Sequence, residues 1–529
     1  MKITEEKFKN IVIVCLLLIS SCAILYFYLN GDQHLLYGDA LSRLNIARKL
    51  MDNLTPGFAQ LGNVWLPLPQ VLMSLFTWNF TLWQTGLAGT IVSTFFTILG
   101  GYYIYQTLIL ITRSRIAGVF GSAIFALNIN ILYMQTTAMS ESIFVGLSML
   151  MTYLLLKWLH TKQSSYLILA AVTISGITLT RYEGLALLAT SILIVPICSA
   201  YIHGKKSKVE GDLIMFSTLA CFGFGLWTIY LTLIFGDPLY WKNYYADTQV
   251  TNIAQSIPSY AENINFFEAV WKYFTAAVWM NGLIPMMLSF IGVTLIILRS
   301  IKLKSVNYIP LVLPFSISLF MVLTLMRNTP IDQPELTMVN ILSTKTSYLP
   351  EFNIRYGLLL LPWVAVFCGF IFSIKFLPLK ILLILLMLFQ FQSYFTNNIS
   401  IIYQIPRSIS GNNTQGTIRD KALLAGMKEK YNGGLMMISA LKHDPQMFQM
   451  GIDYKNFIHE GTDKYWKKSI TDPQVYAKWI SLDINNPNDQ VTKFLKDSPS
   501  IKNYYDLVYE YQGMQLYKIR TAPEIPVPK

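Results

Sequence analysis

The chain has 529 residues, of which 53% are hydrophobic and only 13% are charged, and its mean hydropathy is +0.44. Soluble globular proteins carry about 25% charged residues, so this composition excludes an ordinary soluble protein and predicts a polytopic membrane protein. The net charge of +12 does not indicate nucleic-acid binding, because the basic residues lie between apolar runs, where membrane topology accounts for them.

The cysteines predict neither a disulfide framework nor a CxxC metal site, because all of them lie inside apolar runs. They are Cys15, Cys22, Cys198, Cys221 and Cys368.

The first apolar run, residues 11–29, follows Lys2, Lys7 and Lys9. At about 1.5 Å per residue it is long enough to cross a hydrocarbon core of about 30 Å. It is also longer than the apolar part of a signal peptide, about 7–15 residues, so we expect it to be the first membrane span.

The polar segment after this span, residues 31–60, has apolar residues at helical spacing: Leu41, Leu44, Ala47 and Leu50. This pattern predicts an amphipathic helix at the membrane interface, ended by the Pro-Gly pair at 56–57. Trp65 then suits a membrane border, and residues 71–80 are expected to re-enter the membrane in part.

Further apolar runs bring the expected number of membrane spans to about eleven. Including the first, they are 11–29, 82–111, 116–133, 143–159, 166–179, 185–201, 213–235, 270–298, 308–326, 356–374 and 379–395.

Basic residues mark every second connection between these runs, on the same side as the N-terminus. By the positive-inside rule that side is the cytoplasm, and an odd number of spans puts the C-terminus outside. We therefore expect a multi-pass protein of the plasma membrane. Its transmembrane domain is predicted over residues 1–400, including a first outer loop at 31–63, and an extracytoplasmic domain over 410–529.

The C-terminal segment has the composition of a small α/β domain. Its helices are predicted around 417–430, 445–451, 464–469 and 489–496, and its strands at 435–438, 477–482, 505–509 and 514–519. The two His-acid pairs here, His443-Asp444 and His459-Glu460, are expected to be surface features and not metal ligands.

Charged residues gather where the predicted spans end on the outer side. Asp39 and Arg43 stand four residues apart, on one face of a helix. Ionisable groups at a membrane border need a partner or a role, which makes Asp39 our candidate catalytic residue. The others are Glu141, the triplet Arg181-Tyr182-Glu183, the Asp237-Pro238 pair and Arg355-Tyr356.

These motifs resemble a known family. The chain reads Tyr-Gly-Asp-Ala-x-x-Arg at 37–43 and Trp-Leu-Pro-Leu-Pro at 65–69, then Met-Ser-Glu at 139–141, Thr-Arg-Tyr-Glu-Gly at 180–184, Gly-Asp-Pro-Leu at 236–239 and Arg-Tyr at 355–356. Over residues 1–395 this is similar to membrane glycosyltransferases of the C-type fold, of the family 39 or protein-mannosyltransferase-like kind, with kinship to aminoarabinose and oligosaccharyl transferases.

The resemblance implies inverting transfer of a sugar, mannose-type or another hexose or pentose, from a polyprenyl-phosphate carrier such as a dolichyl phosphate. The acceptor would be a hydroxyl or amine of a protein, lipid or glycan. Asp39 matches the family's first-loop aspartate and would be the general base. Arg181 and Arg355 would bind the donor phosphate. Supporting or substrate-binding roles fall to Arg43, Glu141, Tyr182, Glu183, Trp65 and Tyr356.

One departure from the family concerns the acid pair. Asp39 is followed by Ala40 and not by a second acid, which leaves the general-base pair incomplete and puts a protein acceptor in doubt. The resemblance implies no required cofactor, although Asp39, Glu141 and Glu183 are acids that a divalent cation could use.

Simpler interpretations of the same residues stay open. Asp39 and Arg43 are also compatible with an exposed ion pair, Glu141 with a helix cap, Arg181 and Glu183 with span-end anchors, and Asp237-Pro238 with a turn. The aromatic group Tyr240, Trp241, Tyr244 and Tyr245 fits an interfacial belt better than a sugar platform.

Two other function classes also stay open. A polytopic lipid or solute transporter, or a flippase, would carry ionisable residues in mid-span and inverted repeats, whereas the charges here gather at one side. A non-catalytic scaffold would use the C-terminal domain to recruit a partner.

Overall fold

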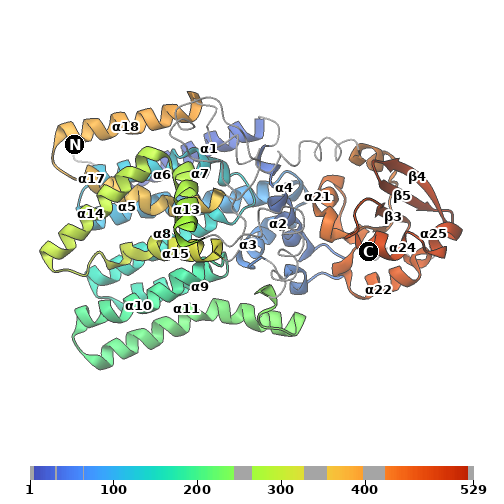
Figure 1. Cartoon of the computed structure of the whole chain (residues 1–529), viewed down its shortest axis with the longest axis horizontal. Coiled ribbons are helices and arrows are strands. Elements are labelled where there is room, and N and C mark those ends of the chain that lie inside the picture. The colour runs from blue at the N-terminus through green and yellow to red at the C-terminus, as the bar shows by residue number, and fades with distance from the viewer. Residues whose placement is uncertain are drawn as a thin grey trace. The chain divides into compact units, whose positions relative to one another are not determined.

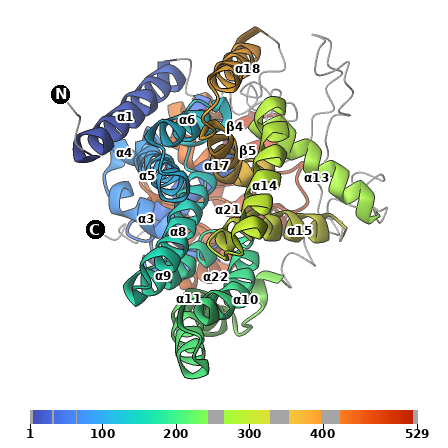
Figure 2. The same ribbon diagram turned by 90° about the vertical axis from the view of Figure 1, so that its left-hand side faces the viewer.

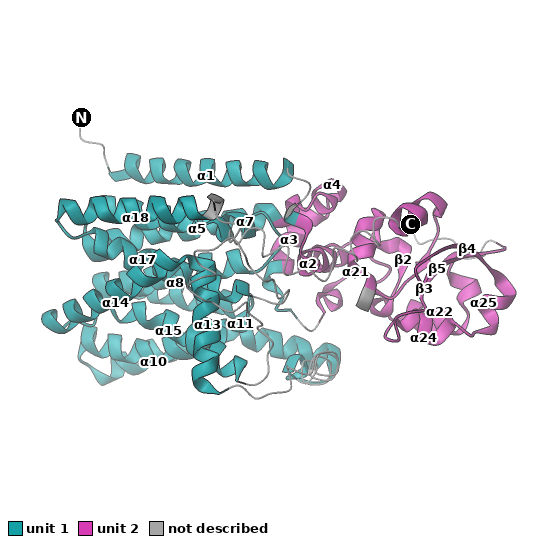
Figure 3. Cartoon of the chain, turned by 45° about the horizontal axis from the view of Figure 1, so that its top comes forward, with its two compact units in different colours: residues 1–34, 63–69, 90–409 teal, residues 35–62, 70–89, 410–529 magenta. Residues whose placement is uncertain are grey.

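A computed structural model describes residues 5–29, 33–62, 65–242, 265–326, 354–396 and 423–521. These residues divide into two compact units (Figure 3). Unit 1 consists of residues 1–34, 63–69 and 90–409, and unit 2 of residues 35–62, 70–89 and 410–529. Tyr244 and Tyr245 of the predicted aromatic group lie outside the described residues.

Unit 1 is built from helices that pack side by side, and several are viewed nearly end on in Figure 2. Neighbours along the chain are also neighbours in space, as with α8, α9, α10 and α11 (Figure 1). The helices are α1 (Glu5–Leu29), α5 (Leu87–Thr112), α6 (Arg115–Ala126), α7 (Ile129–Met134), α8 (Glu141–Thr161), α9 (Ser164–Thr178), α10 (Gly184–His203), α11 (Lys206–Phe235), α13 (Phe266–Asn281), α14 (Leu283–Leu303), η4 (Ile309–Val312), α15 (Leu313–Leu325), η5 (Ile354–Leu360), α17 (Leu361–Phe372) and α18 (Leu377–Thr396).

Seven helical segments within the described ranges are long and apolar enough to cross a membrane: α1, α5, α8, α10, α11, α14 and η5 with α17. Each falls in one of the predicted runs. The other predicted runs contain the shorter apolar helices α6, α9, η4 with α15, and α18. The chain is therefore a mainly α-helical, polytopic integral membrane protein, as its composition predicts.

Two runs that we expected to be continuous are broken in the structure. The run 270–298 divides at Gly282, whose φ of +87° is a conformation that other residues rarely adopt, so α13 ends and α14 begins there. The run 116–133 divides because the Asn128 side chain accepts hydrogen bonds from the backbone N–H groups of Asn130 and Ile131 and so starts a new helix, α7. Hydropathy alone does not register such caps.

Unit 2 contains a five-stranded sheet in the order β2-β1-β3-β5-β4. Strand β1 is parallel to β2 and β3, whereas β5 is antiparallel to β3 and β4. The strands are β1 (Met436–Met437), β2 (Phe457–Ile458), β3 (Trp479–Asp483), β4 (Tyr505–Tyr511) and β5 (Met514–Ile519); the helices of this segment include α21 (Ala440–Met450), α22 (Lys464–Thr471), α23 (Pro473–Tyr476), α24 (Gln490–Leu495) and α25 (Pro499–Tyr504).

The α/β class predicted for the C-terminal segment is confirmed, together with most of its elements. Helices α22 and α24 and strands β1, β3, β4 and β5 lie where the sequence predicts them. Strand β2 was not predicted, because Phe457 and Ile458 stand between Asn456 and His459 and are not part of a longer apolar run. The predicted helix 417–430 falls only partly within the described residues, which are helical over 423–430.

The predicted helix of the first loop is present as α2 (Gly38–Lys49), and most of its residues are buried. It belongs to unit 2, together with residues 70–77 of α3 (Leu68–Thr77) and with α4 (Phe80–Gln84), and it packs on α21. Its Arg48 is buried and paired with Asp52 at 2.7 Å and Asp453 at 2.9 Å. The polar face of α2 therefore finds its partners inside unit 2, and the position of this helix at the membrane interface stays a prediction.

The two histidines expected at the surface of this segment are buried. His443 is 4% exposed and pairs with Asp489, with 3.0 Å between Nε2 and Oδ2. His459 is 2% exposed, and its Nδ1 accepts a hydrogen bond from Gly461 N at 3.1 Å. The surface assignment is wrong because each imidazole has a partner within the domain.

We expect unit 2 to lose stability below neutral pH through His459. Burial, and then the nearby Lys49, hold the pKa of His459 well below its usual value near 6.5. The imidazole therefore binds a proton near pH 6.5 in the unfolded chain, whereas in the folded chain it stays neutral at that pH. The contribution of neutral His459 to the free energy of unfolding is fully present above pH 6.5. It is lost as the pH falls below 6.5, by up to about 1.4 kcal/mol per pH unit.

Thermal unfolding of the full chain in detergent, followed by tryptophan fluorescence between pH 7.5 and 5.5, measures this effect. His459→Asn keeps an acceptor toward Gly461 but cannot titrate, and it should flatten the decline. His160→Asn, which changes an exposed ring, is the matched control. A decline of equal steepness in His459→Asn and the wild type would contradict the assignment.

Candidate active site

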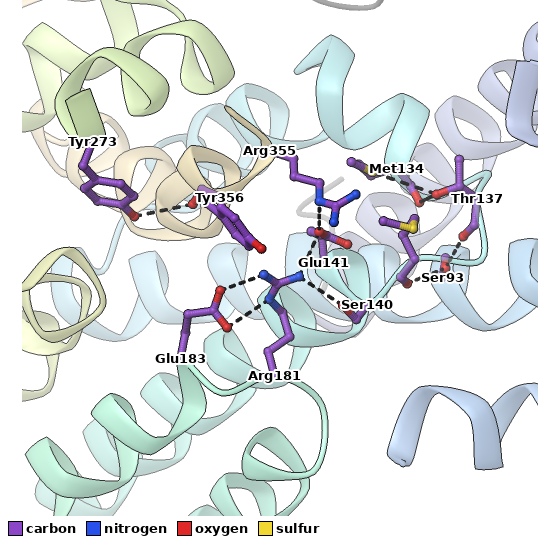
Figure 4. A network of polar contacts seen from close by, with 11 residues as sticks. Ser93, Met134, Thr137, Ser140, Glu141, Arg181, Glu183, Tyr273, Arg355 and Tyr356 are labelled. Atoms are coloured by element: carbon purple, nitrogen blue, oxygen red, sulfur yellow. Dashed lines mark hydrogen bonds and ion pairs between the residues drawn. The ribbon is translucent and has the colours of Figure 1, made fainter. Parts of the chain in front are cut away.

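Three short segments of unit 1 that are not α-helical position Glu141, Arg181, Glu183 and Arg355 (Figure 4). The loop 135–140 precedes α8, the turn 179–183 separates α9 from α10, and η5 precedes α17. Backbone that leaves the helical conformation inside a membrane protein must find hydrogen-bond partners within the protein. The hydrogen bonds that each segment makes to the rest of the protein determine where its side chains lie.

The loop 135–140 is held by hydroxyl groups of α5. Thr90 Oγ1 donates to Thr136 O, and Ser93 Oγ donates to Thr137 O, each at 2.7 Å. Thr94 Oγ1 donates to Gln135 O at 3.1 Å. These bonds replace those that a helix would supply and fix the start of α8, where Glu141 is the first residue.

The turn 179–183 is held in a similar way. Leu68 N donates to Leu179 O at 3.0 Å, and Thr180 Oγ1 donates to Gly176 O at 2.9 Å. Residues 180 and 183 are buried. The turn therefore presents Arg181 from a fixed backbone.

Arg181 is the most connected side chain of the site. Its guanidinium grips Glu183 with two bonds, Nη2 to Oε1 at 2.7 Å and Nε to Oε2 at 3.3 Å. Its Nη1 donates to Glu141 Oε1 at 2.8 Å and to Ser140 Oγ at 3.1 Å. Figure 4 shows the guanidinium between the two carboxylates.

Glu141 joins the two arginines. Its carboxylate is fully buried, and the same Oε1 atom that accepts from Arg181 lies 3.2 Å from Arg355 Nε. The Tyr356 ring makes cation–π contacts with both arginines, with its centroid 5.0 Å from Arg181 Cζ and 5.9 Å from Arg355 Cζ. One carboxylate and one aromatic ring therefore keep two guanidinium groups close together (Figure 4).

The four charges balance formally, which is how a buried ionic cluster avoids a large desolvation penalty. Arg181 is gripped by both carboxylates, whereas the ion pair of Arg355 engages Nε. The planar fork of a guanidinium is suited to bidentate contact with phosphate or carboxylate. The cluster therefore has the donors that an anionic group requires.

The structure brings five of the predicted site residues into this one cluster: Glu141, Arg181, Glu183, Arg355 and Tyr356. Glu141 also begins α8, as the capping interpretation expected, and Asp237 forms the expected turn by accepting from Leu239 N at 2.8 Å.

The other two predicted residues of unit 1 are Tyr182, within the turn 179–183, and Trp65. Tyr182 points its ring toward Trp241, with the ring centroids 4.5 Å apart and the planes nearly parallel. Trp65 is half-buried.

Asp39 and Arg43 belong to unit 2, where both lie on α2. Asp39 is half-buried in the first turn of this helix, a position where the helix dipole favours a carboxylate. Arg43 is 6% exposed, so the interpretation of these two residues as an exposed pair is wrong for Arg43. The base assigned to Asp39 stays a prediction.

Sequence reasoning missed the polar residues that support the cluster. Ser140 was read as part of a motif without a role, and Asn281 and Tyr273 lie inside a run that was treated as uniformly apolar. The signal was present for Asn281, because an amide in an apolar run needs a partner. Within the described ranges, no group of three or more His, Cys, Asp or Glu side chains is arranged to hold a metal ion.

Comparison with known proteins finds likeness in structure. No protein-family model matches the chain, and no curated protein sequence matches it significantly. The crystal structure of the Archaeoglobus fulgidus oligosaccharyltransferase, a complex with Zn and sulfate, matches with a TM-score of 0.50 at 12% identity, over 96% of this chain and 73% of that one. ArnT from Cupriavidus metallidurans bound to undecaprenyl phosphate matches with a TM-score of 0.47 at 12% identity, over 96% and 99%. The same protein in the apo state gives 0.45 at 12% identity, over 95% and 97%.

At this identity the likeness concerns the fold alone. The match to the oligosaccharyltransferase extends over nearly the whole of this chain. Together with the apolar helices and the C-terminal sheet, it shows that the chain has the fold of the C-type membrane glycosyltransferases.

Proposed function

We propose that this protein transfers a sugar from a polyprenyl-phosphate carrier to a hydroxyl or amine of a protein, lipid or glycan, with inversion at the anomeric carbon. The reaction takes place on the outer face of the plasma membrane, with the N-terminus in the cytoplasm and the C-terminal α/β domain outside. The fold is compatible with this chemistry, and the cluster of Arg181, Glu141 and Arg355 is the observation that carries the proposal.

Two guanidinium groups that share a buried carboxylate, Glu141, are suited to a departing phosphate. As the bond between the anomeric carbon and the carrier phosphate breaks, negative charge grows on the phosphate oxygens, and preorganised cations stabilise it best where water is excluded. Arg181 and Arg355 take this role. Glu141 and Glu183 hold the two forks in place before the donor arrives.

The acceptor supplies the electron pair for the new bond. Its hydroxyl or amine attacks the anomeric carbon while Asp39 accepts the proton, because an un-ionised hydroxyl is a poor nucleophile. The sugar passes to the acceptor, and the polyprenyl phosphate leaves. Trp65, Tyr182 and Tyr356 are suited to contacts with the sugar or the carrier, and Arg43 supports Asp39 on α2.

Replacing Asp39 by Asn tests the base. The change keeps the size of the side chain and removes its ability to take a proton, so transfer of radiolabelled sugar from defined polyprenyl-phosphate sugars should fall by about 10²–10⁴-fold. The assay uses purified protein in lipid, and Asp237→Asn, which alters a turn carboxylate, is the control. Wild-type rates in Asp39→Asn would move the base elsewhere. Absence of transfer from any donor by folded wild type would favour a transporter or flippase.

Replacing Arg181 by Lys tests the phosphate site. Lysine keeps the charge but loses the fork that grips Glu183, and charge-assisted hydrogen bonds of this kind contribute about 1.5–3 kcal/mol. Transfer should therefore fall by about 10–100-fold, with a higher donor KM. Arg299→Lys, at a guanidinium that rests on Tyr308 and Phe370, should leave the rate unchanged. Equal losses in both variants would indicate a general effect of arginine replacement.

We also expect EDTA to leave the transfer rate within about twofold of its untreated value. Glu141 and Glu183 are engaged by guanidinium groups, and these cations can supply the positive charge that a phosphate leaving group requires. Sugar transfer measured with and without EDTA, and again after addition of Mg²⁺ or Mn²⁺, checks this. Loss in EDTA that a divalent ion restores would contradict the expectation.

A further inference from the structure

The last residue of α13, Asn281, makes a contact that the reaction scheme does not yet use. Its side chain is fully buried, and Nδ2 donates to Gly357 O at 2.9 Å and to Ala277 O at 2.7 Å. Gly357 follows Arg355 and Tyr356 in η5. The amide of Asn281 therefore ties the segment that carries two residues of the cluster to the end of a neighbouring helix.

The backbone of η5 lies directly against α13 at this point. A Cβ added to Gly357 would come within 2.3 Å of Ala276 O and 2.5 Å of Ala276 C, both backbone atoms that cannot move aside as a side chain would. Tyr273 Oη, also on α13, lies 3.4 Å from Tyr356 O and donates to it (Figure 4). Helix α13 is thus the surface on which η5 rests.

The end of α13 is in turn held by α7. Asn128 Nδ2 and Asn130 Nδ2 both donate to Met280 O, at 3.0 and 2.8 Å, and both side chains are buried. The other end of α7 leads into the loop 135–140 and so to Glu141. One short helix therefore fixes the start of the Glu141 segment and, through α13, the segment of Arg355.

We infer that Asn281, assisted by Asn128 and Asn130, is a positioning residue that sets Arg355 and Tyr356 against Glu141. The inference rests on the proposed function, in which Arg355 binds the carrier phosphate. The 3.2 Å contact between Arg355 Nε and Glu141 Oε1 depends on two separate backbone segments, and the three asparagines help to connect them through α13 and α7. Asn281 does not itself touch the substrate.

The simpler interpretation is that these amides only satisfy backbone carbonyl groups at helix ends. Both interpretations predict lower stability when an amide is removed. Only the positioning role predicts a selective loss of affinity for the phosphate group of the lipid, because only that role acts through Arg355.

Asn281→Leu is the decisive variant. Leucine keeps the γ-branched shape of asparagine and suits an apolar surrounding, but it cannot donate to Gly357 O. Titrations by native mass spectrometry would compare undecaprenyl phosphate with undecaprenol, which lacks the phosphate. We expect Asn281→Leu to bind the phosphate lipid about tenfold more weakly, the loss of one charge-assisted contact, and the alcohol within twofold of the wild type. Hydrogen exchange at 354–360 should become faster.

Ser289→Ala provides the matched control, because Ser289 is a buried polar residue of α14 whose Oγ donates to Met286 O at 2.7 Å. It should leave both affinities unchanged. Equal losses for the two lipids in Asn281→Leu, or no loss for either, would overturn the inference. Asn130→Leu tests the same connection from α7 and remains informative where Asn281→Leu fails to fold. It should show the same selectivity with a smaller loss, because Asn128 still holds Met280 O.

Failure of the proposed function has a different signature. Wild-type protein that binds undecaprenol as tightly as undecaprenyl phosphate would argue against a phosphate site. The exchange data would then decide the inference separately: faster exchange at 354–360 in Asn281→Leu would retain Asn281 as the support of η5, and unchanged exchange would overturn it.

Discussion

The candidate site depends on one carboxylate oxygen. Glu141 Oε1 is fully buried, and it accepts from Arg181 and lies beside Arg355. Two guanidinium groups would repel each other in a medium of low dielectric, and the shared carboxylate allows both to stay within one cluster. The cluster forms only where the first residue of α8, the turn between α9 and α10, and η5 meet. The packing of the helices of unit 1 brings these three places together.

The need to hold these segments together explains why the apolar runs contain polar residues. Thr90 and Ser93 hold the loop before Glu141, and Asn281 holds the segment of Arg355. Each supplies to a non-helical carbonyl the hydrogen bond that neither lipid nor a regular helix can provide. The irregular segments are tolerated because they are enclosed by side chains that satisfy them, and irregular backbone is what allows the four charged side chains to converge.

Sequence patterns were informative where a property extends over many residues. Hydropathy located the apolar helices of unit 1, and short apolar runs located four of the five strands described. The position of charged residues at the ends of the spans, together with the motifs, singled out Glu141, Arg181, Glu183, Arg355 and Tyr356. Single-residue effects were less visible. The breaks at Gly282 and Asn128 depend on one backbone conformation and one cap. The burial of α2 depends on contacts between segments some 400 residues apart in the chain, such as Arg48 with Asp453, and that of His443 on contacts such as the one with Asp489, 46 residues further along.

In the C-terminal domain, a position that would suit a bound anion is occupied by a carboxylate of the chain itself, that of Glu460. In parallel α/β sheets, ligands bind beyond the carboxyl ends of the strands, and an anion is favoured at the start of the helix that follows. At the start of α21, after β1, Ala440 N donates to Glu460 Oε2 at 2.8 Å, and Ser439 Oγ donates to the other oxygen of the same carboxylate. A phosphate at this position would have to displace Glu460. Under the proposed function, the arginines of unit 1 are therefore the better place for the carrier phosphate, whereas α21 is in contact with α2, the helix that carries Asp39.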